Sequence, residues 1–123
     1  MKRPLEIDTV ERSGAVILLV AGEIDLSTAP LFEEKLLAAE ATEATTVVID
    51  LERVSFMDST GLKVLIKHAV PEAGGGRVRV TPGSAQVRRL FGITGLLQRV
   101  SFESPGATWQ PPGPSPDPPP VAA

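Results

Sequence analysis

A helix-forming stretch between two continuous apolar segments constrains the fold of this chain more than any other feature. The apolar segments are residues 15–20 (AVILLV) and 46–51 (TVVIDL), and runs of this length are typical of strands buried on both faces. Between them, apolar residues recur at helical spacing: Ala29, Phe32, Leu36 and Ala39. Ser27 or Thr28 is a suitable cap for this helix, which we expect to end between Glu40 and Glu43. A helix between two buried strands implies a parallel crossover, so the sequence predicts an α/β fold.

Further strands complete a mixed sheet. Residues 5–11 alternate apolar and polar side chains, and the turn 12–14 (RSG) joins them to the first apolar segment as an antiparallel hairpin. Residues 77–81 (RVRVT) predict a short strand with basic side chains on one face, as suits a sheet edge. Residues 99–103 predict a last strand. We therefore expect a mixed β-sheet, with an antiparallel first hairpin and then parallel crossovers, flanked by α-helices.

Two more helices are expected on this sheet. The first follows Asp58, and its apolar side chains are spaced to face inward: Leu62, Leu65, Ile66 and Ala69. Lys63, Lys67 and Val70 fall largely on its other side, and residues 52–57 are expected to connect it to the preceding strand. Ser84 is a suitable cap for the second helix, whose inward-facing residues are Val87, Leu90 and Phe91.

The chain divides into a domain at residues 1–103 and a proline-rich tail at residues 104–123. At 123 residues it is long enough for one core, and the tail holds eight of its twelve prolines and one charge, Asp117. We expect the tail to be extended, polyproline-like and disordered. A passive tail is one interpretation. The alternative is a docking segment for a proline-binding domain, with Trp109 as its anchor.

Charge and composition narrow the classes of partner. Residues 1–58 carry 12 acidic and 5 basic side chains, whereas residues 59–123 carry 3 acidic and 7 basic ones. This asymmetry describes either two solvated faces or a polarised surface that orients a protein partner. The basic residues are scattered without interleaved aromatics, so we expect no nucleic acid partner. With no cysteine, no apolar run near ~20 residues and no signal segment, we expect a cytoplasmic protein without a membrane partner.

Catalytic and metal chemistry find little support. The only histidine, His68, lies roughly 13 Å along the predicted helix from Ser59, too far for a nucleophile and its base. Met57 stands where a nucleophile elbow requires glycine, and no histidine–cysteine cluster offers a metal site. We expect a protein that is not an enzyme, without metal or cofactor, in which His68 is a partly exposed surface residue.

The polar segment at residues 58–61 (DSTG) allows two interpretations. Asp58 and Ser59 are both good helix caps, a role worth ~1 kcal/mol. Ser59 is also a suitable phosphoacceptor, because a phosphate adds about −1.5 to −2 charges and meets the free N–H groups of a helix start. Gly61 costs ~1 kcal/mol in a helix and would let a partner's backbone approach closely. The spacing of these residues alone supports a helix cap and a phosphorylation switch equally.

Three motifs together resemble a known family. Residues 22–30 (GEIDLSTAP), 47–62 (VVIDLERVSFMDSTGL) and 87–96 (VRRLFGITGL) are similar to STAS domains, and specifically to the bacterial anti-sigma factor antagonists. The resemblance covers about residues 5–103. It implies that an anti-sigma factor serine kinase phosphorylates Ser59, that a serine phosphatase resets it, and that ATP belongs to the kinase. It also places Asp25 near the phosphorylation site.

The resemblance defines the expected function. Unphosphorylated, the chain would bind the anti-sigma factor and free the sigma factor for transcription; phosphorylation of Ser59 would end the binding. The expected partner-binding residues surround the serine: Asp25, Asp58, Thr60, Gly61, Lys63 and Lys67. Thr60 is a second possible acceptor. The alternative is a STAS scaffold or regulatory subunit of a transporter or signalling complex, without a phosphorylation switch. Family members commonly carry a final helix where this chain has the tail. The sequence leaves open what covers the sheet face or groove that the missing helix would leave.

Overall fold

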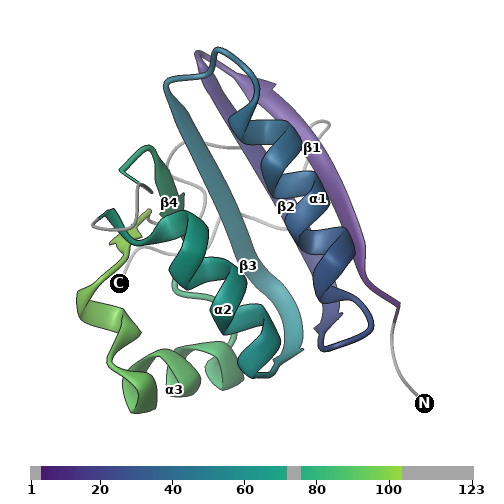
Figure 1. Ribbon diagram of the computed structural model, residues 1–123, viewed down its shortest axis with the longest axis vertical. Coiled ribbons are helices and arrows are strands. Elements are labelled where there is room, and N and C mark those ends of the chain that lie inside the picture. The colour runs from purple at the N-terminus through teal and green to yellow at the C-terminus, as the bar shows by residue number, and fades with distance from the viewer. Residues whose placement is uncertain (1–3, 72–75, 104–123) are drawn as a thin grey trace, which may run out of the picture.

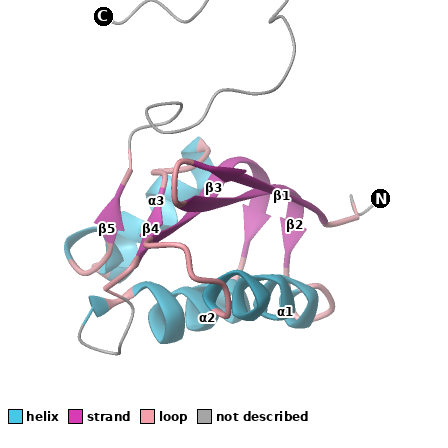
Figure 2. Ribbon diagram, turned by 90° about the horizontal axis from the view of Figure 1, so that it is seen from above, coloured by secondary structure: helices cyan, strands magenta, loops and turns pink. Residues whose placement is uncertain are grey.

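Five strands form one mixed sheet in the computed structural model, which describes residues 4–71 and 76–103. The strands follow the chain order β1-β2-β3-β4-β5 across the sheet, with β1 and β2 antiparallel and every later pair parallel. Helices α1 and α2 lie side by side on one face of the sheet, and α3 packs near its lower end in the view of Figure 1 (Figures 1 and 2). The predicted α/β fold with a mixed sheet is confirmed.

The first hairpin joins β1 (Glu6–Arg12) to β2 (Ala15–Ile24). Its two-residue turn places Ser13 and Gly14 at φ 47° and 84°, the left-handed conformation that tight hairpins require. Strand β2 runs four residues beyond the predicted end, through Gly22 at φ 104°. A Cβ on Gly22 would lie 2.3 Å from the carbonyl oxygen of Pro4, so only glycine fits there.

Helix α1 (Ala29–Glu40) provides the first crossover, between β2 and β3 (Thr46–Met57). Its buried residues are the predicted ones: Ala29, Phe32, Leu36 and Ala39. Strand β3 is twice as long as the segment predicted from its apolar run, because its pairing with β2 continues to Met57 despite register shifts along the way. Residues 52–57 are therefore strand and not a connection.

Helix α2 (Ser59–Ala69) returns the chain toward β4 (Val78–Val80). Leu62, Leu65 and Ala69 are buried as predicted, but Ile66 is exposed and Val64 takes its place. Val70, expected on the outer side, is fully buried because the chain leaves the helix there in an extended conformation.

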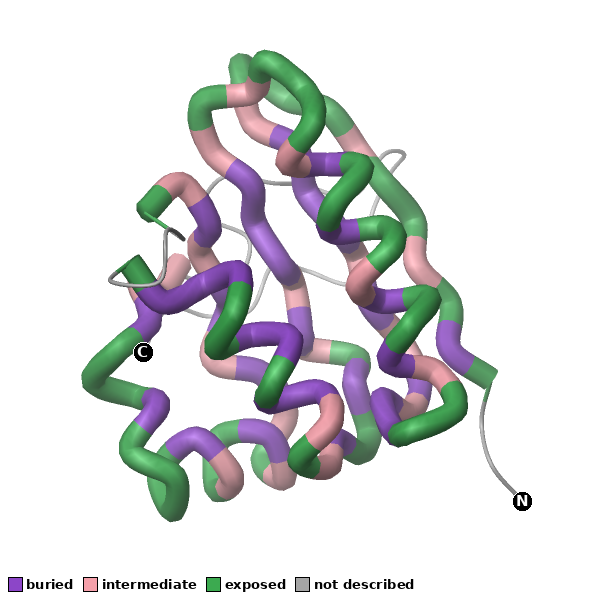
Figure 3. The backbone as a smooth tube through the Cα atoms, in the orientation of Figure 1, coloured by how far each residue is buried: buried purple, intermediate pink, exposed green. Residues whose placement is uncertain are grey.

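The last elements close the sheet beyond β4. Helix α3 (Ala85–Thr94) begins as predicted, with the Ser84 hydroxyl accepting the Val87 N–H, and the 3-10 turn η2 (Leu96–Gln98) leads to β5 (Ser101–Phe102). Strand β4 was expected at an edge, which is wrong: β3 pairs with one of its sides and β5 with the other. Figure 3 shows the buried stretches on β2, β3, α1 and α2 facing one another.

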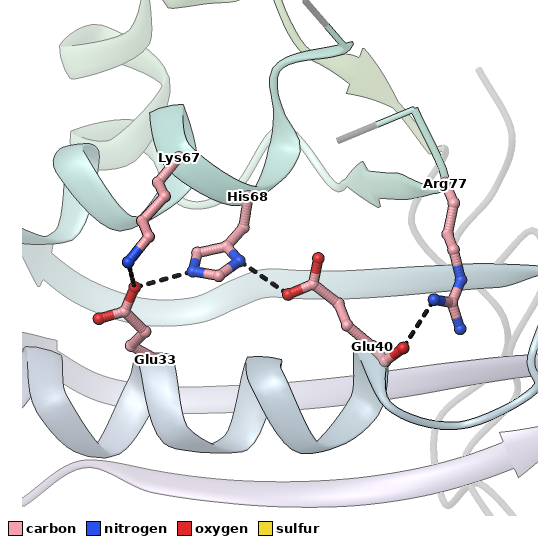
Figure 4. Close-up of polar contacts among 5 residues, drawn as sticks. All are labelled: Glu33, Glu40, Lys67, His68 and Arg77. Atoms are coloured by element: carbon pink, nitrogen blue, oxygen red, sulfur yellow. Dashed lines mark hydrogen bonds and ion pairs between the residues drawn. The ribbon is translucent and has the colours of Figure 1, made fainter. Parts of the chain in front are cut away.

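A polar cluster links α2 to α1 at the buried side chain of His68 (Figure 4). The Nδ1 of His68 lies 2.7 Å from Glu40 Oε1, and its Nε2 lies 2.8 Å from Glu33 Oε2. Lys67 Nζ lies 3.1 Å from the same Glu33 oxygen, and Arg77 donates to the Glu40 carbonyl at 2.7 Å. Hydrogen bonds from His68 and then Lys67 hold the pKa of Glu33 below its usual value. The predicted surface role of His68 is therefore wrong: it bridges two helices.

Candidate functional site

Two neighbouring parallel strands end side by side and bring the candidate residues together. Ile24, the last residue of β2, is paired with Met57, the last residue of β3. The N–H of Asp58 donates to the carbonyl of Ile24 at 3.1 Å, which ties the two strand ends to each other. Asp25 and Asp58 thus follow adjacent strands at the carboxyl edge of the sheet, where neighbouring strands are about 4.8 Å apart.

Asp58 caps the helix that carries the candidate serine. Its backbone is extended, and its Oδ1 accepts the N–H of Thr60 at 2.9 Å as well as the Thr60 hydroxyl. The capping interpretation of the sequence is confirmed for Asp58. Because the Thr60 hydroxyl donates to this carboxylate and is partly buried, Thr60 is the less accessible of the two candidate acceptors.

Ser59 is the first residue of α2 and is exposed. Among the described residues, none forms a hydrogen bond with its hydroxyl, so this group is accessible to a modifying enzyme. The N–H groups of the first helical turn have no partner within the helix and carry a partial positive charge. A phosphate on Ser59 would lie beside these groups and beside the Asp58 carboxylate.

Asp25 is buried and organises the turn before α1. Its Oδ1 accepts from the N–H and the hydroxyl of Ser27, at 3.0 and 2.7 Å, and from the N–H of Thr28 at 3.2 Å. Thr28 occupies the cap position without a capping hydrogen bond from its side chain, and its hydroxyl donates instead to the Glu23 carbonyl at 2.8 Å. The predicted cap residue is thus confirmed as Thr28 by its position, but its side chain forms no capping hydrogen bond. The carboxylate of Asp25 accepts the N–H groups at this turn instead.

Gly61 faces the interior of its own domain. It is buried, and a Cβ built on it would lie 2.6 Å from Met57 Cγ and 2.8 Å from Ile24 Cγ2. The expectation that its missing side chain leaves room for a partner's backbone is wrong, because the last side chains of β2 and β3 fill that room. Gly61 lets α2 pack directly onto the two strand ends.

The two lysines lie at different distances from Ser59. Lys63 is exposed and follows Ser59 by one helical turn, so both residues share a face of α2. Lys67 lies two turns away, about 12 Å along the axis, where its ammonium pairs with Glu33. Lys63 therefore belongs to the surroundings of Ser59, whereas Lys67 belongs to the contact between α1 and α2.

Two exposed apolar side chains at the same strand ends were missed from the sequence. Leu26 directly follows Asp25 and is 77% exposed, and Phe56, near the end of β3, is 41% exposed. Large apolar side chains on the surface are common at protein–protein contacts. A hydrophobic residue between Asp25 and Ser27, inside a polar turn, was the available signal.

Comparison with known proteins identifies the family. The family model described as STAS domain matches residues 6–106 of this chain. The chain belongs to the STAS domain family. Its relatives include the anti-sigma-B factor antagonist of Bacillus subtilis (strain 168), which is 36% identical over 101 residues that cover 81% of this chain and 92% of the relative.

Solved structures of anti-sigma factor antagonists agree with this fold. An anti-sigma factor antagonist from Mycobacterium paratuberculosis superposes with a TM-score of 0.69 at 30% identity, over 83% of this chain and 89% of its own. SpoIIAA, an anti-sigma factor antagonist, superposes in its unphosphorylated form with a TM-score of 0.60 at 26% identity, over 82% and 89% of the two chains. Its phosphorylated form from Bacillus gives 0.54 at 25% identity, over 82% and 92%. These comparisons confirm the resemblance to the anti-sigma factor antagonists.

The helices that the structure describes in residues 4–71 and 76–103 are too short or too polar to span a bilayer.

Proposed function

We propose that this STAS protein binds an anti-sigma factor that is a serine kinase, and that phosphorylation of Ser59 ends the binding. In the unphosphorylated state the complex would free a sigma factor for transcription. The observation that carries the proposal is the exposed hydroxyl of Ser59 at the first turn of α2, beside Asp25 and Asp58 on adjacent strand ends. The antagonist names of the relatives, and a structural neighbour known in both phosphorylation states, support it.

In this proposal the phosphate acts at the surface of the domain. It adds about −1.5 to −2 charges at pH 7, next to the carboxylate of Asp58. The N–H groups at the start of α2 favour this negative charge, so the helix itself is not disrupted. A partner surface that fits a neutral serine then meets added bulk and repulsion of its own carboxylates. The switch thus changes the affinity for a partner without refolding the domain.

The neighbouring residues have separate roles in the proposed contact. Leu26 and Phe56 offer apolar surface to the partner, and Lys63 offers a positive charge on the same helix face as Ser59. Asp58 orients the first turn of α2 through Thr60, and Asp25 holds the turn that presents Leu26. A serine phosphatase that acts on the exposed phosphoserine would restore binding. ATP belongs to the kinase, and this chain acts as its substrate and not as an enzyme.

The proposal is tested by incubating the full chain with a serine kinase anti-sigma factor of the same organism and ATP, followed by phosphopeptide mapping. Phosphate is expected on Ser59, and Ser59→Ala should abolish labelling while retaining binding. Ser59→Glu should weaken binding strongly. Thr9→Glu is the matched control, because Thr9 is also exposed but lies on β1, so it introduces the same charge outside the helix start and the proposed contact.

Two results would contradict this function. One is phosphate found away from both Ser59 and Thr60. The other is an affinity that Ser59→Glu lowers no more than Thr9→Glu does. In the latter case a scaffold role without a phosphorylation switch becomes the better interpretation.

A further inference from the structure

The face of the sheet opposite α1 and α2 carries an apolar row that crosses the strands. The row follows the strand register from Val10 to Ile17 and Val48, and it ends at the charged side chain of Arg79. The alternate residues of the same strands, among them Val16, Leu18, Val47 and Ile49, point the other way into the apolar cluster formed with the helices. Residues of this row therefore define a second surface, which we call the back face.

The centre of the back face is apolar and buried. Ile17 and Val48 are 0% and 2% exposed, yet neither belongs to the apolar cluster that holds the buried residues of α1, α2 and α3. Asp50 lies two residues after Val48 on β3, paired with Leu19, so its side chain is on the same face of the sheet. Burial raises the pKa of its carboxyl group. Apolar side chains on an uncovered sheet face would stay in contact with water, so this face needs a cover other than the three helices.

A groove on the back face begins where the described chain ends. The groove has a volume of about 400 Å³, and its lining includes Glu103 and Arg79 at one end, Val48 and Thr46 in the middle, and Ala15 and Arg12 at the other. Glu103 donates its N–H to the Val80 carbonyl at 2.8 Å, and its carboxylate lies 2.7 Å from Arg79 Nε. These contacts hold Glu103, the last described residue, at the rim of this groove.

The tail lies outside the described residues, and its composition predicts disorder throughout. We propose instead that its first six residues, 104–109, cross the back face along this groove and that Trp109 covers the apolar row beside Val10 and Ile17. Six residues in a polyproline conformation span about 19 Å at 3.1 Å per residue. Four strand spacings, from β5 to β1, also span about 19 Å. Trp109 therefore reaches the far end of the row. The occupant is this chain's own segment because it starts at the groove and is tethered there, so its effective concentration is high.

The composition of this segment fits the groove. Residues 104–109 (SPGATW) carry no charge, so no ionised group loses its hydration when they lie on an apolar surface. A polyproline-like backbone has no internal hydrogen bonds, and its carbonyls need donors such as the hydroxyls of Thr46 and Ser13 that line the groove. This inference is independent of the phosphorylation proposed for Ser59, which lies at the start of α2 and outside the groove.

Fluorescence of the full chain tests this placement, because Trp109 is the only tryptophan and the chain has no tyrosine. We expect a blue-shifted emission and weaker quenching by acrylamide than in the urea-denatured chain. Val10→Glu should shift the emission toward that of the denatured chain, since Val10 lies on the back face. Thr9→Glu, the neighbouring exposed position on the other face of β1, is the matched control and should leave it unchanged.

Three results would overturn the inference. The first is an emission and quenching of the folded full chain that equal those of the denatured chain, a comparison that needs no variant. The second is an equal shift for Thr9→Glu and Val10→Glu in proteins that circular dichroism shows to be folded. The third is an emission that changes with protein concentration together with a doubled mass in light scattering, which would assign the cover to a second copy.

Discussion

Replacing His68 by alanine should destabilise the domain more than any single surface substitution on α2. The imidazole is within 2.8 Å of a carboxylate oxygen at each of its two nitrogens, one from Glu40 and one from Glu33. A neutral imidazole has one N–H and can donate to only one of them, whereas the doubly protonated ring donates to both. Without the ring, Glu33 and Glu40, which are both on α1, lose the group that they share, and among the described residues only Glu33 keeps another partner, Lys67.

The size of this effect follows from the exposure of the partners. A hydrogen bond to a charged group contributes about 1.5–3 kcal/mol when its loss leaves a buried group unsatisfied. The carboxylates of Glu33 and Glu40 are 29% and 25% exposed, so water replaces part of the lost interaction. We therefore expect His68→Ala to lower the free energy of unfolding by about 2–4 kcal/mol in total. In urea this corresponds to a midpoint lower by about 1–2 M at an unchanged slope.

Lys67→Ala is the matched control for this measurement. Lys67 neighbours His68 and contacts the same Glu33 oxygen at 3.1 Å, but its side chain is 68% exposed. An exposed ion pair contributes about 0–1 kcal/mol, so the control should change the midpoint little. Equal losses for the two variants, or a loss below about 0.5 kcal/mol for His68→Ala, would refute the argument that burial gives this cluster its strength.

Three further outcomes follow from individual contacts. The pKa of Glu33 is lowered in the folded protein from its unfolded value of 4.5, so its carboxylate stabilises the fold above that value and this stability is lost as pH falls through the folded pKa. Glu33→Gln should therefore be less stable than the parent chain at pH 7, and urea titrations should show this deficit shrinking as the pH falls below 4.5. Burial raises the pKa of Asp50, so its ionised form opposes folding; Asp50→Asn should raise the free energy of unfolding at pH 7, and the gain should disappear as pH falls through the folded pKa. Gly61→Ala places a Cβ 2.6 Å from Met57 Cγ, and overpacking of about 1–3 kcal/mol should exceed the ~1 kcal/mol gained in helix propensity, so its melting temperature should fall and not rise.

Local patterns predicted much of this fold. The helical spacing of Ala29, Phe32, Leu36 and Ala39 identified the buried face of α1, and the turn at Ser13 and Gly14 identified the first hairpin. These features depend on residues close in sequence. Strand β3 was predicted too short because its register shifts against β2 break the alternation of apolar and polar side chains between Asp50 and Met57.

Other features depend on partners that no local pattern contains. His68 was expected at the surface because its two carboxylates lie 28 and 35 residues earlier, on another helix. Gly61 was interpreted as open to a partner because its neighbours Met57 and Ile24 come from two strand ends that meet only in the fold. The proximity of Asp25 to the serine was expected from the family resemblance alone. The parallel pairing of β2 with β3 supplies the physical reason, since it places Asp25 and Asp58 side by side.

The close contact of Gly61 with Ile24 and Met57 has a consequence for any enzyme that acts at Ser59. With no side chain between α2 and the strand ends, the height and direction of the first helical turn are set by atoms in direct contact. Ser59 therefore belongs to a surface that the ends of two strands and the start of a helix form together. A short synthetic peptide with the sequence of residues 54–64 would lack Asp25, Leu26 and this surface. An enzyme that acts at Ser59 would therefore need the folded domain as its substrate.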